Sequence, residues 1–236
     1  MKLISQTYNT IIHKIFNFFR WKFSKSSREK ALVMHNYDLQ NKSKMIFIHI
    51  PKAAGISVHK SLFGFDSVGH VSLTAYQKYL KPSVIKQFKI VSFVRNPYTR
   101  LLSSYFYLKN GGRGNKLDLK YQSLFSTFKS FEEFILLFLD EQNIYKFEHL
   151  VPQVYWLMDK NKELNIDFIG RFENLENDYN TISKWLKNTT SLMHLNKTKQ
   201  KTKTLFSEEM LEIINKLYYG DFMQLNYEMK TKEFYL

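Results

Sequence analysis

The chain has 236 residues, of which 44% are hydrophobic and 17% aromatic, enough for one sizeable hydrophobic core. Its formal net charge is +14, from 35 Lys and Arg against 21 Asp and Glu, which favours an anionic partner: nucleic acid, anionic lipid, a polyanionic glycan or a nucleotide. The lack of cysteine excludes disulfides, thiolate metal sites and cysteine nucleophiles, and it fits a reducing compartment.

Residues 4–23 are predicted to form an amphipathic helix. The apolar side chains fall on one side of a helical wheel, and the polar and basic side chains fall on the other. Two interpretations stay open: a helix docked on the core of its own chain, or a helix lying on an anionic membrane surface. We therefore expect residues 1–40 to form a basic N-terminal extension and residues 41–236 to form the main domain.

The sequence has no apolar run close to the roughly 20 residues that a membrane-spanning helix needs. Its first residues also lack the uninterrupted apolar core and the small-residue cleavage site of a secretory signal. We expect the chain to reside in the cytoplasm, where residues 4–23 offer a contact with the cytoplasmic face of the inner membrane.

Three apolar segments are each followed by a stretch with helical character. They are "MIFIHI" at 45–50, "FKIVSFV" at 88–94 and "IDFIGRF" at 166–172. Because strands that alternate with helices form crossover units, the sequence predicts an α/β fold with a central parallel sheet. Between the second and third segments we expect a Gly- and Lys-rich loop at 109–120 and a short apolar helix at 131–140.

The segment after the first strand, residues 51–57, has the composition of an anion-binding loop. Its small residues let backbone N–H groups approach an anion closely, and the following helix presents its N-terminus to the same anion. Lys52 adds a mobile positive charge and Ser57 a hydroxyl donor. The loop lacks the G-x-x-x-x-G-K-[ST] pattern of nucleotide hydrolases. The alternative is an ordinary strand–helix turn with a surface lysine.

The second strand leads into "RNPYTRLLSSY" at 95–105. Asn96 followed by Pro97 is a typical helix start, because the asparagine side chain caps the helix and proline fits its first position. Arg95 therefore ends the strand, and both its guanidinium and the Ser103 hydroxyl, about two turns into the helix, can bind one anion. The alternative is that Arg95 is a surface charge and Ser103 a packing residue.

Together, "IFIHIPKAAGIS" and "FVRNPYTRLLSSY" resemble the two cofactor-binding loops of the sulfotransferases that use 3′-phosphoadenosine 5′-phosphosulfate (PAPS). The resemblance is closest to the carbohydrate sulfotransferases that include the heparan-uronyl 2-O and chondroitin 4-O enzymes, and "IDFIGRFENLENDYN" is similar to a later segment of that group. It covers residues 45–227 in patches. It implies a P-loop-kinase-like parallel sheet flanked by helices, makes 41–236 the sulfotransferase domain, and leads us to expect a bacterial member.

The resemblance implies that PAPS is the sulfuryl donor and assigns residues to it. Arg95 and Ser103 would hold the 3′-phosphate. The 5′-phosphate and sulfate would be held by the first loop, that is by Lys52, Ala53, Ala54, Gly55, Ile56 and Ser57. Family members more often read G-G-T or G-C-T where this chain has Ala-Gly-Ile-Ser, so Ile56 departs from the family pattern.

Sulfuryl transfer is an in-line displacement at sulfur, and the acceptor hydroxyl must lose a proton to a base. "GHVSLTAYQKY" at 69–79 resembles the segment of the heparan 2-O enzymes that carries their catalytic histidine, which places His70 at the matching position. Those enzymes have a second histidine where this chain has Val68. The alternative is that His70 caps the next helix. Lys52 is the second expected catalytic residue, because it can offset negative charge on the leaving phosphate oxygen.

"EHLVPQ" at 148–153 looks like a substrate-side segment of the family, so His149 and Gln153 are expected to bind the acceptor. His149 is also the reserve candidate for the base, and Glu148 is a weaker one. His49 is expected to be a core residue of the first strand.

The segment 194–210 carries several lysines. The family has a basic loop here that closes over the cofactor or an anionic glycan, which implies cofactor-binding roles for Lys199 and Lys201. The alternative is a solvated run of charges.

The sequence thus predicts an enzyme that transfers a sulfuryl group from PAPS to a carbohydrate hydroxyl, on a glycan or glycolipid, with neither a metal nor a nucleic-acid partner. Two alternatives stay open. A nucleotide-dependent small-molecule kinase of similar fold would need a Mg²⁺ site and a fuller Gly-Lys-Ser/Thr loop, neither of which we find in the sequence. A non-enzymatic protein that binds nucleic acid or a membrane would explain the charge but leave the two loops as accidents.

Overall fold

A computed structural model describes most of the chain, namely residues 26–65, 69–187, 190–193 and 203–236. The amphipathic helix predicted at 4–23 lies outside these ranges, as do Lys199 and Lys201. Among the described helices, none combines the length and the apolar character that crossing a membrane requires.

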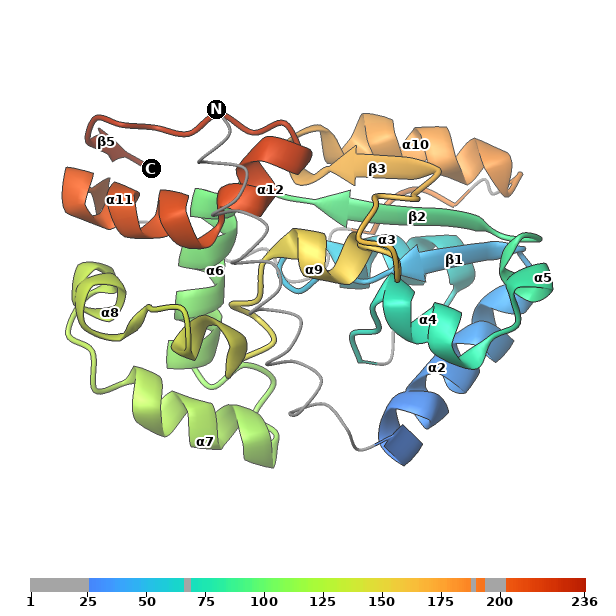
Figure 1. The fold of residues 1–236 in the computed structure, drawn as a ribbon, viewed down its shortest axis with the longest axis horizontal. Helices are drawn as coiled ribbons and strands as arrows, with labels where there is room; N and C mark the ends of the chain where they lie inside the picture. Colours follow the sequence, from blue (N-terminus) through green and yellow to red (C-terminus); the bar gives the residue numbers. More distant parts are fainter. Residues whose placement is uncertain (1–25, 66–68, 188–189, 194–202) are drawn as a thin grey trace.

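A parallel sheet lies at the centre of the fold (Figure 1). Within the described residues it has three strands in the order β1-β2-β3, with bounds Met45–Ile48, Lys89–Val94 and Phe168–Arg171. In register, Phe47 lies opposite Val91 and Phe93 lies opposite Gly170. The α/β fold with a central parallel sheet is therefore confirmed, with each strand one to three residues shorter than its apolar segment.

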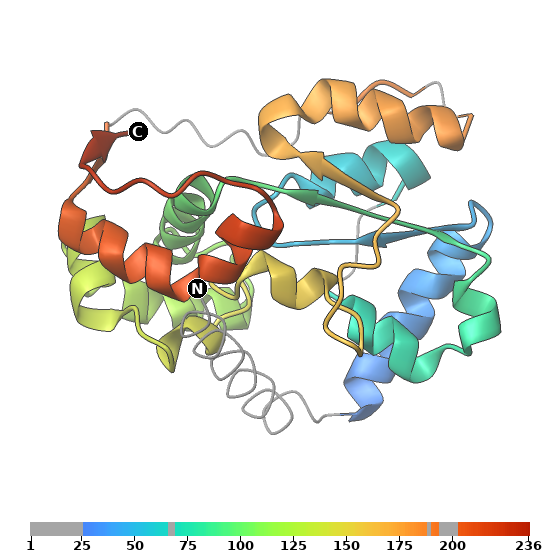
Figure 2. The same cartoon turned by 45° about the horizontal axis from the view of Figure 1, so that its top comes forward.

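Helices precede, connect and follow the strands, and they cover both faces of the sheet (Figures 1 and 2). A short antiparallel pair, β4 and β5, lies near the C-terminus. The bounds of these elements are α2 Ser26–Asn41, α3 Gly55–Phe63, α4 Leu73–Tyr79, α5 Pro82–Ile85, α6 Pro97–Lys109, α7 Lys116–Phe125, α8 Phe131–Phe138, η1 Asn143–Tyr145, α9 Gln153–Leu157, η2 Phe172–Asn174, α10 Leu175–Trp185, β4 Leu205–Phe206, α11 Glu208–Leu217, α12 Tyr219–Gln224 and β5 Phe234–Tyr235.

The two faces of the sheet follow from the alternation of side chains along each strand. One face packs against α3 and α10 through the buried side chains of Met45, Phe47, Val91 and Phe93. The other face joins a larger core with α2, α4, α6 and α9, through Ile46, Ile48, Ile90 and Val94. Because both faces are covered, the strands are apolar at nearly every position, as the sequence indicated.

The prediction of a loop across 109–120 is wrong in its second half. Helix α6 extends to Lys109, and α7 already begins at Lys116. The Asn115 side chain caps α7 by accepting hydrogen bonds from two backbone N–H groups, and Phe125 at the end of α7 is fully buried. The cap and the buried phenylalanine account for a helix where the Gly- and Lys-rich composition indicated a loop.

Helix α2 is packed on the main domain. Val33 is fully buried, and the buried Gln40 side chain accepts a hydrogen bond from the backbone N–H of Phe47 in β1, at 3.1 Å. Residues 26–41 therefore contribute to the core. The division of the chain at residue 40 stays a prediction for residues 1–25, which lie outside the described part.

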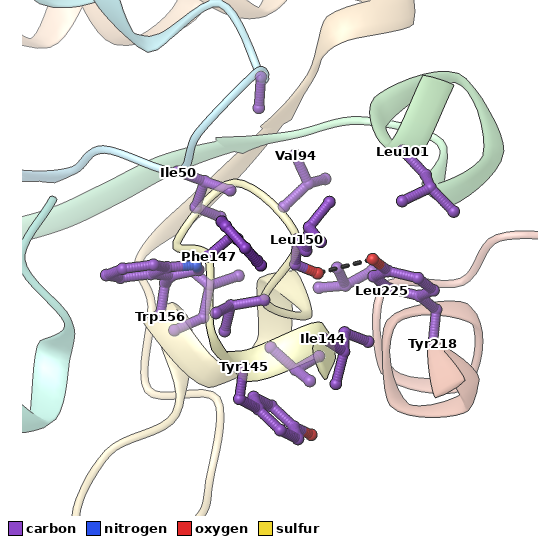
Figure 3. Close-up of a cluster of buried hydrophobic side chains, with 14 of the residues drawn as sticks. Ile50, Val94, Leu101, Ile144, Tyr145, Phe147, Leu150, Trp156, Tyr218 and Leu225 are labelled. Atoms are coloured by element: carbon purple, nitrogen blue, oxygen red, sulfur yellow. Dashed lines mark hydrogen bonds between the residues drawn. The ribbon is translucent and has the colours of Figure 1, made fainter. Parts of the chain in front are cut away.

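A second part of the core lies beyond the carboxyl end of the sheet (Figure 3). Here the segment from η1 to α9 packs between Ile50 and Val94 on one side and Tyr218 on the other. The Tyr218 hydroxyl donates a hydrogen bond to the Leu150 carbonyl at 2.6 Å. This contact ties the chain just before α9 to the C-terminal helices.

We expect Gly170→Ala to lower the free energy of unfolding by about 1–3 kcal/mol, because a methyl group in β3 would overpack the core. A Cβ at this position would lie 2.5 Å from Cε1 of the Phe93 ring. Urea denaturation of the full chain measures the change.

A double-mutant cycle with Phe93→Leu provides the control, because leucine leaves more room beside residue 170. The cost of Gly170→Ala should be smaller in the Phe93→Leu background. An equal cost in both backgrounds would contradict the assignment of the strain to Phe93.

Candidate active site

The two anion-binding junctions predicted from the sequence lie side by side at the carboxyl edge of the sheet. Parallel pairing of β1 with β2 places the ends of both strands at this edge, where open α/β sheets bind their ligands. Arg95, directly after β2, donates from Nη1 to the backbone carbonyl of Lys52, at 3.3 Å. The structure thus brings the first loop and Arg95 into contact.

The first loop presents backbone N–H groups at the open end of α3. Lys52 and Ala54 have φ angles of 65° and 62°, a left-handed conformation that costs a non-glycine residue about 1–2 kcal/mol. Ala54 precedes α3 without a side-chain cap, and the first N–H groups of a helix point outward from its end. Strained backbone beside an uncapped helix end is the arrangement of an anion-binding loop.

Gly55 is required by the close approach of His49. A Cβ at position 55 would lie 1.8 Å from Cδ2 of the His49 ring. The neighbouring Ala53 and Ser57 are buried, whereas Ile56 is half-buried. The first turn of α3 is therefore packed against the end of β1, which fixes the position of the loop.

The Lys52 side chain runs from the first loop along α6. Its ammonium nitrogen lies 4.2 Å from the centre of the Tyr107 ring, a cation–π contact. Burial, followed by the positive charges of Arg95 and Arg113, lowers the pKa of Lys52 to about 8. A lysine with these surroundings gains from binding an anion.

Two side chains, besides the Lys52 carbonyl, hold the Arg95 guanidinium. Its Nε donates to the Thr99 hydroxyl at 3.0 Å, and its guanidinium carbon lies 4.1 Å from the centre of the Phe172 ring. Burial lowers the pKa of Arg95 to about 10, while the nearby carboxylate of Glu173 raises it. The guanidinium is thus oriented but only partly neutralised.

Ser103 lies on the side of α6 that faces the first loop. It is four residues from Thr99 and four from Tyr107, so the three side chains share one face of the helix. Thr99 contacts Arg95, and Tyr107 contacts Lys52. Ser103, which is half-buried, therefore lies between the two cations along the helix.

Gln153 lies against the backbone of Arg95, and its binding of an acceptor stays a prediction. The side chain is fully buried, and its Oε1 accepts from the Arg95 backbone N–H at 2.8 Å. Its Nε2 donates to the Arg95 carbonyl at 2.8 Å and to Asp221 Oδ2 at 3.3 Å. With its polar atoms engaged in this way, Gln153 positions the backbone of Arg95.

The segment that carries Glu148 and His149 is fixed to α6 by buried hydrogen bonds. Arg100 is fully buried and donates to the carbonyls of His149 and Val151, at 3.3 and 2.7 Å. The Ser104 hydroxyl also donates to the His149 carbonyl, at 2.8 Å. These contacts fix the backbone of His149 and Val151 against α6.

His70 lies beside His49, with 4.4 Å between the ring centres. Its Nδ1 donates to the His49 carbonyl at 2.8 Å, so in the neutral ring Nε2 carries the lone pair. That Nε2 atom is 3.9 Å from Glu148 Oε1. The next helix, α4, is capped by Ser72, so His70 does not serve as its cap.

His149 is buried and stacked on Tyr107, with 4.6 Å between the ring centres. Its Nδ1 has no hydrogen-bond partner among the described residues. Burial lowers the pKa of His149 well below its usual value, and His70 and Lys52 act in the same direction. The pKa of His49 is lowered in the same way, first by burial and then by His70. Both rings are therefore neutral at physiological pH.

Several residues of the site were not predicted from the sequence. Tyr107 could have been found, because it follows Ser103 by four residues in the same helix. Phe172 and Glu173 follow β3, and Glu173 Oε1 accepts from the Asn96 backbone N–H at 2.7 Å; the strand–helix pattern that marked the first two junctions also marks this one. Arg113 is exposed in the turn between α6 and α7, and no motif distinguishes it.

Comparison with protein families gives a match to the sulfotransferase family over residues 35–228. This range includes the central sheet, both anion-binding junctions and the three histidines His49, His70 and His149. No significant match was found among curated proteins or among solved structures. The resemblance is confirmed at the level of the family, while the carbohydrate subgroup and the bacterial origin stay predictions. The extent of the match and the parallel sheet flanked by helices together show that this chain belongs to the sulfotransferase family.

Proposed function

We propose that this sulfotransferase moves a sulfuryl group from PAPS to a hydroxyl of a carbohydrate, on a glycan or a glycolipid. The hydrogen bond from Arg95 to the Lys52 carbonyl carries the proposal, because it joins two anion-binding junctions at one edge of the sheet. PAPS has two anionic ends that suit such a pair. Membership of the family favours sulfuryl transfer over the phosphoryl transfer of a kinase.

The proposed donor site divides between the two junctions. The N–H groups at the start of α3, with Lys52 and Ser57, would bind the 5′-phosphosulfate. Arg95 and Ser103 would bind the 3′-phosphate. The face of α6 that carries Ser103 supports this division. On that face Thr99 contacts Arg95, and Tyr107 contacts Lys52. We also propose Lys199 and Lys201 as further contacts to the donor.

In the proposed reaction, His70 Nε2 takes the proton of the acceptor hydroxyl as the hydroxyl oxygen attacks sulfur. The bond from sulfur to the 5′-phosphate oxygen breaks, which leaves a sulfate ester, adenosine 3′,5′-bisphosphate and a protonated His70. Lys52 offsets the charge that develops on the leaving oxygen. The contact of His70 Nδ1 with the His49 carbonyl supports this role, because it leaves Nε2 free to accept the proton and stabilises the protonated ring.

The acceptor side of the proposed site lies around His149, Arg113 and the half-buried His70. His149 stays the reserve base; its burial and its stacking on Tyr107 favour His70 for the role. The exposed Arg113 and the net charge of +14 favour an anionic carbohydrate. Contact of residues 4–23 with an anionic membrane, on the cytoplasmic side, would favour a lipid-linked acceptor, and the proposal includes no nucleic-acid partner.

We expect calorimetry to show that adenosine 3′,5′-bisphosphate binds more tightly than AMP. Arg95→Ala should weaken binding of the bisphosphate by about 10- to 100-fold and leave binding of AMP nearly unchanged. The reason is that the lost contact is a charge-assisted hydrogen bond to the 3′-phosphate, which AMP lacks. Lys184→Ala, at an exposed cation of α10, is the matched control. Equal affinities for the two ligands in the unsubstituted chain would refute the 3′-phosphate site.

We expect the affinity for adenosine 3′,5′-bisphosphate to fall as the pH rises through about 8. The Lys52 pKa of about 8 means that the free protein loses this positive charge as the pH rises through that value. Bound phosphate raises the lysine pKa, so proton uptake accompanies binding at higher pH. Titrations between pH 6.5 and 10 measure the effect, and Lys52→Arg should remove it. The same decline in Lys52→Arg would contradict the assignment.

We expect His70→Gln to lower the transfer of ³⁵S from labelled PAPS to the accepting fraction of host glycans by about 10²- to 10⁴-fold, the usual contribution of a general base. Binding of the bisphosphate should be unchanged, because His70 lies on the acceptor side. His35→Gln, at an exposed histidine of α2, is the control. Wild-type transfer by His70→Gln would exclude His70 as the base.

A further inference from the structure

We propose that His70, Glu148 and His149 form a binding site for a zinc ion, and that zinc bound there reversibly blocks sulfuryl transfer. The three residues offer one ligand atom each, and these atoms all lie within 4.8 Å of one another. The blocking effect rests on the proposed function, whereas the metal site itself does not.

The ligand set is one that zinc uses. Two histidine nitrogens and one carboxylate oxygen, with a fourth position open, bind zinc in known enzyme sites, and a tetrahedral ion holds its ligand atoms about 3.4 Å apart. His70 Nε2 and Glu148 Oε1 are already 3.9 Å apart. The Glu148 side chain is 40% exposed, so its rotation can close the remaining distance.

Lone pairs are available on both rings. His70 directs Nδ1 to the His49 carbonyl, and such a contact on the far nitrogen is what orients metal-binding histidines in proteins. His149 is buried, and its Nδ1 has no hydrogen-bond partner in the described part of the chain. A buried ring nitrogen without a partner is uncommon and calls for an explanation, which a bound ion supplies.

The surrounding contacts hold the ligands in place before any ion binds. Arg100 and Ser104 fix the backbone of His149 through its carbonyl. The Trp156 ring lies 5.9 Å from the His70 ring, and Tyr107 stacks on His149. Because three neighbouring side chains need little rearrangement, the entropic cost of forming the site is small.

The charge around the site selects the kind of ion. Lys52 lowers the pKa of His149, and Arg113 lowers the pKa of His49. The two positive charges therefore also repel a cation that is held by charge alone. Mg²⁺ and Ca²⁺, which depend on oxygen ligands, are therefore excluded by the same cations that attract the donor. Zinc forms strong bonds to imidazole nitrogen and needs only one carboxylate here. An anionic donor bound at Lys52 would reduce the repulsion.

Zinc at this site would use the lone pair that the proposed base needs. Coordination of His70 Nε2 prevents it from accepting the proton of the acceptor hydroxyl. We therefore expect micromolar zinc to inhibit transfer and a chelator to restore it.

The test of the site is calorimetric titration of ZnCl₂ into the tag-free, metal-free full chain without donor or acceptor. We expect one zinc per chain and no saturable signal with MgCl₂. Glu148→Gln and His70→Gln should each weaken zinc binding by at least tenfold. Glu132→Gln and His35→Gln, at exposed positions of α8 and α2, should bind zinc like the unsubstituted chain.

Cobalt provides a spectroscopic check, since Co²⁺ in a four-coordinate site absorbs strongly in the visible range. The absorption should be lost in Glu148→Gln, a substitution at a partly exposed side chain that keeps its shape. Zinc binding that is absent, or that both ligand substitutions leave unchanged, would overturn the site.

Activity separates this inference from the proposed function. If the chain binds zinc but transfers no sulfuryl group after a chelator has removed the zinc, the result would refute the function and support the site. Transfer that continues unchanged at saturating zinc would overturn the blocking effect, because an ion on His70 is incompatible with its role as the base.

Discussion

The carboxamide of Gln153 holds the backbone of Arg95 by two hydrogen bonds, and the arrangement of the site depends on this pair. Asp221 of α12 fixes Gln153 in turn, by accepting from its backbone N–H at 2.9 Å. Each buried group left unpaired here would cost about 1–3 kcal/mol. Because Gln153 follows the segment with Glu148 and His149, the same bonds set the spacing between the proposed donor and acceptor sides.

The cations at the edge of the sheet are held at an energetic cost that an anion can offset. Burial lowers the Lys52 pKa from 10.5 to about 8, which corresponds to roughly 3 kcal/mol of disfavoured charge. The pKa of Arg95 is lowered for the same reason. The first loop adds two residues with positive φ. Strain and unneutralised charge at one place indicate a site whose stability increases when an anionic ligand binds.

The sequence predicted those parts of the site that short patterns determine. Asn96 and Pro97 mark a helix start, and parallel strands bring Lys52 and Arg95 to one edge. Contacts between distant segments could not be predicted in this way. The bonds from Gln153 to Arg95 join residues 58 positions apart, so no local motif indicates that Gln153 positions this backbone. The approach of His49 to His70 likewise needs the folded chain.

His49 couples the first loop to the proposed base. Its ring fills the space above Gly55, and its carbonyl lies 2.8 Å from His70 Nδ1. A side chain at position 55 would displace the ring and, with it, the carbonyl that fixes the proton on Nδ1. Since Ser72 rather than His70 caps α4, the orientation of His70 depends on the end of β1. The loop that is proposed to bind the donor therefore also determines which nitrogen of His70 faces the acceptor, so donor binding and proton removal share one structural support.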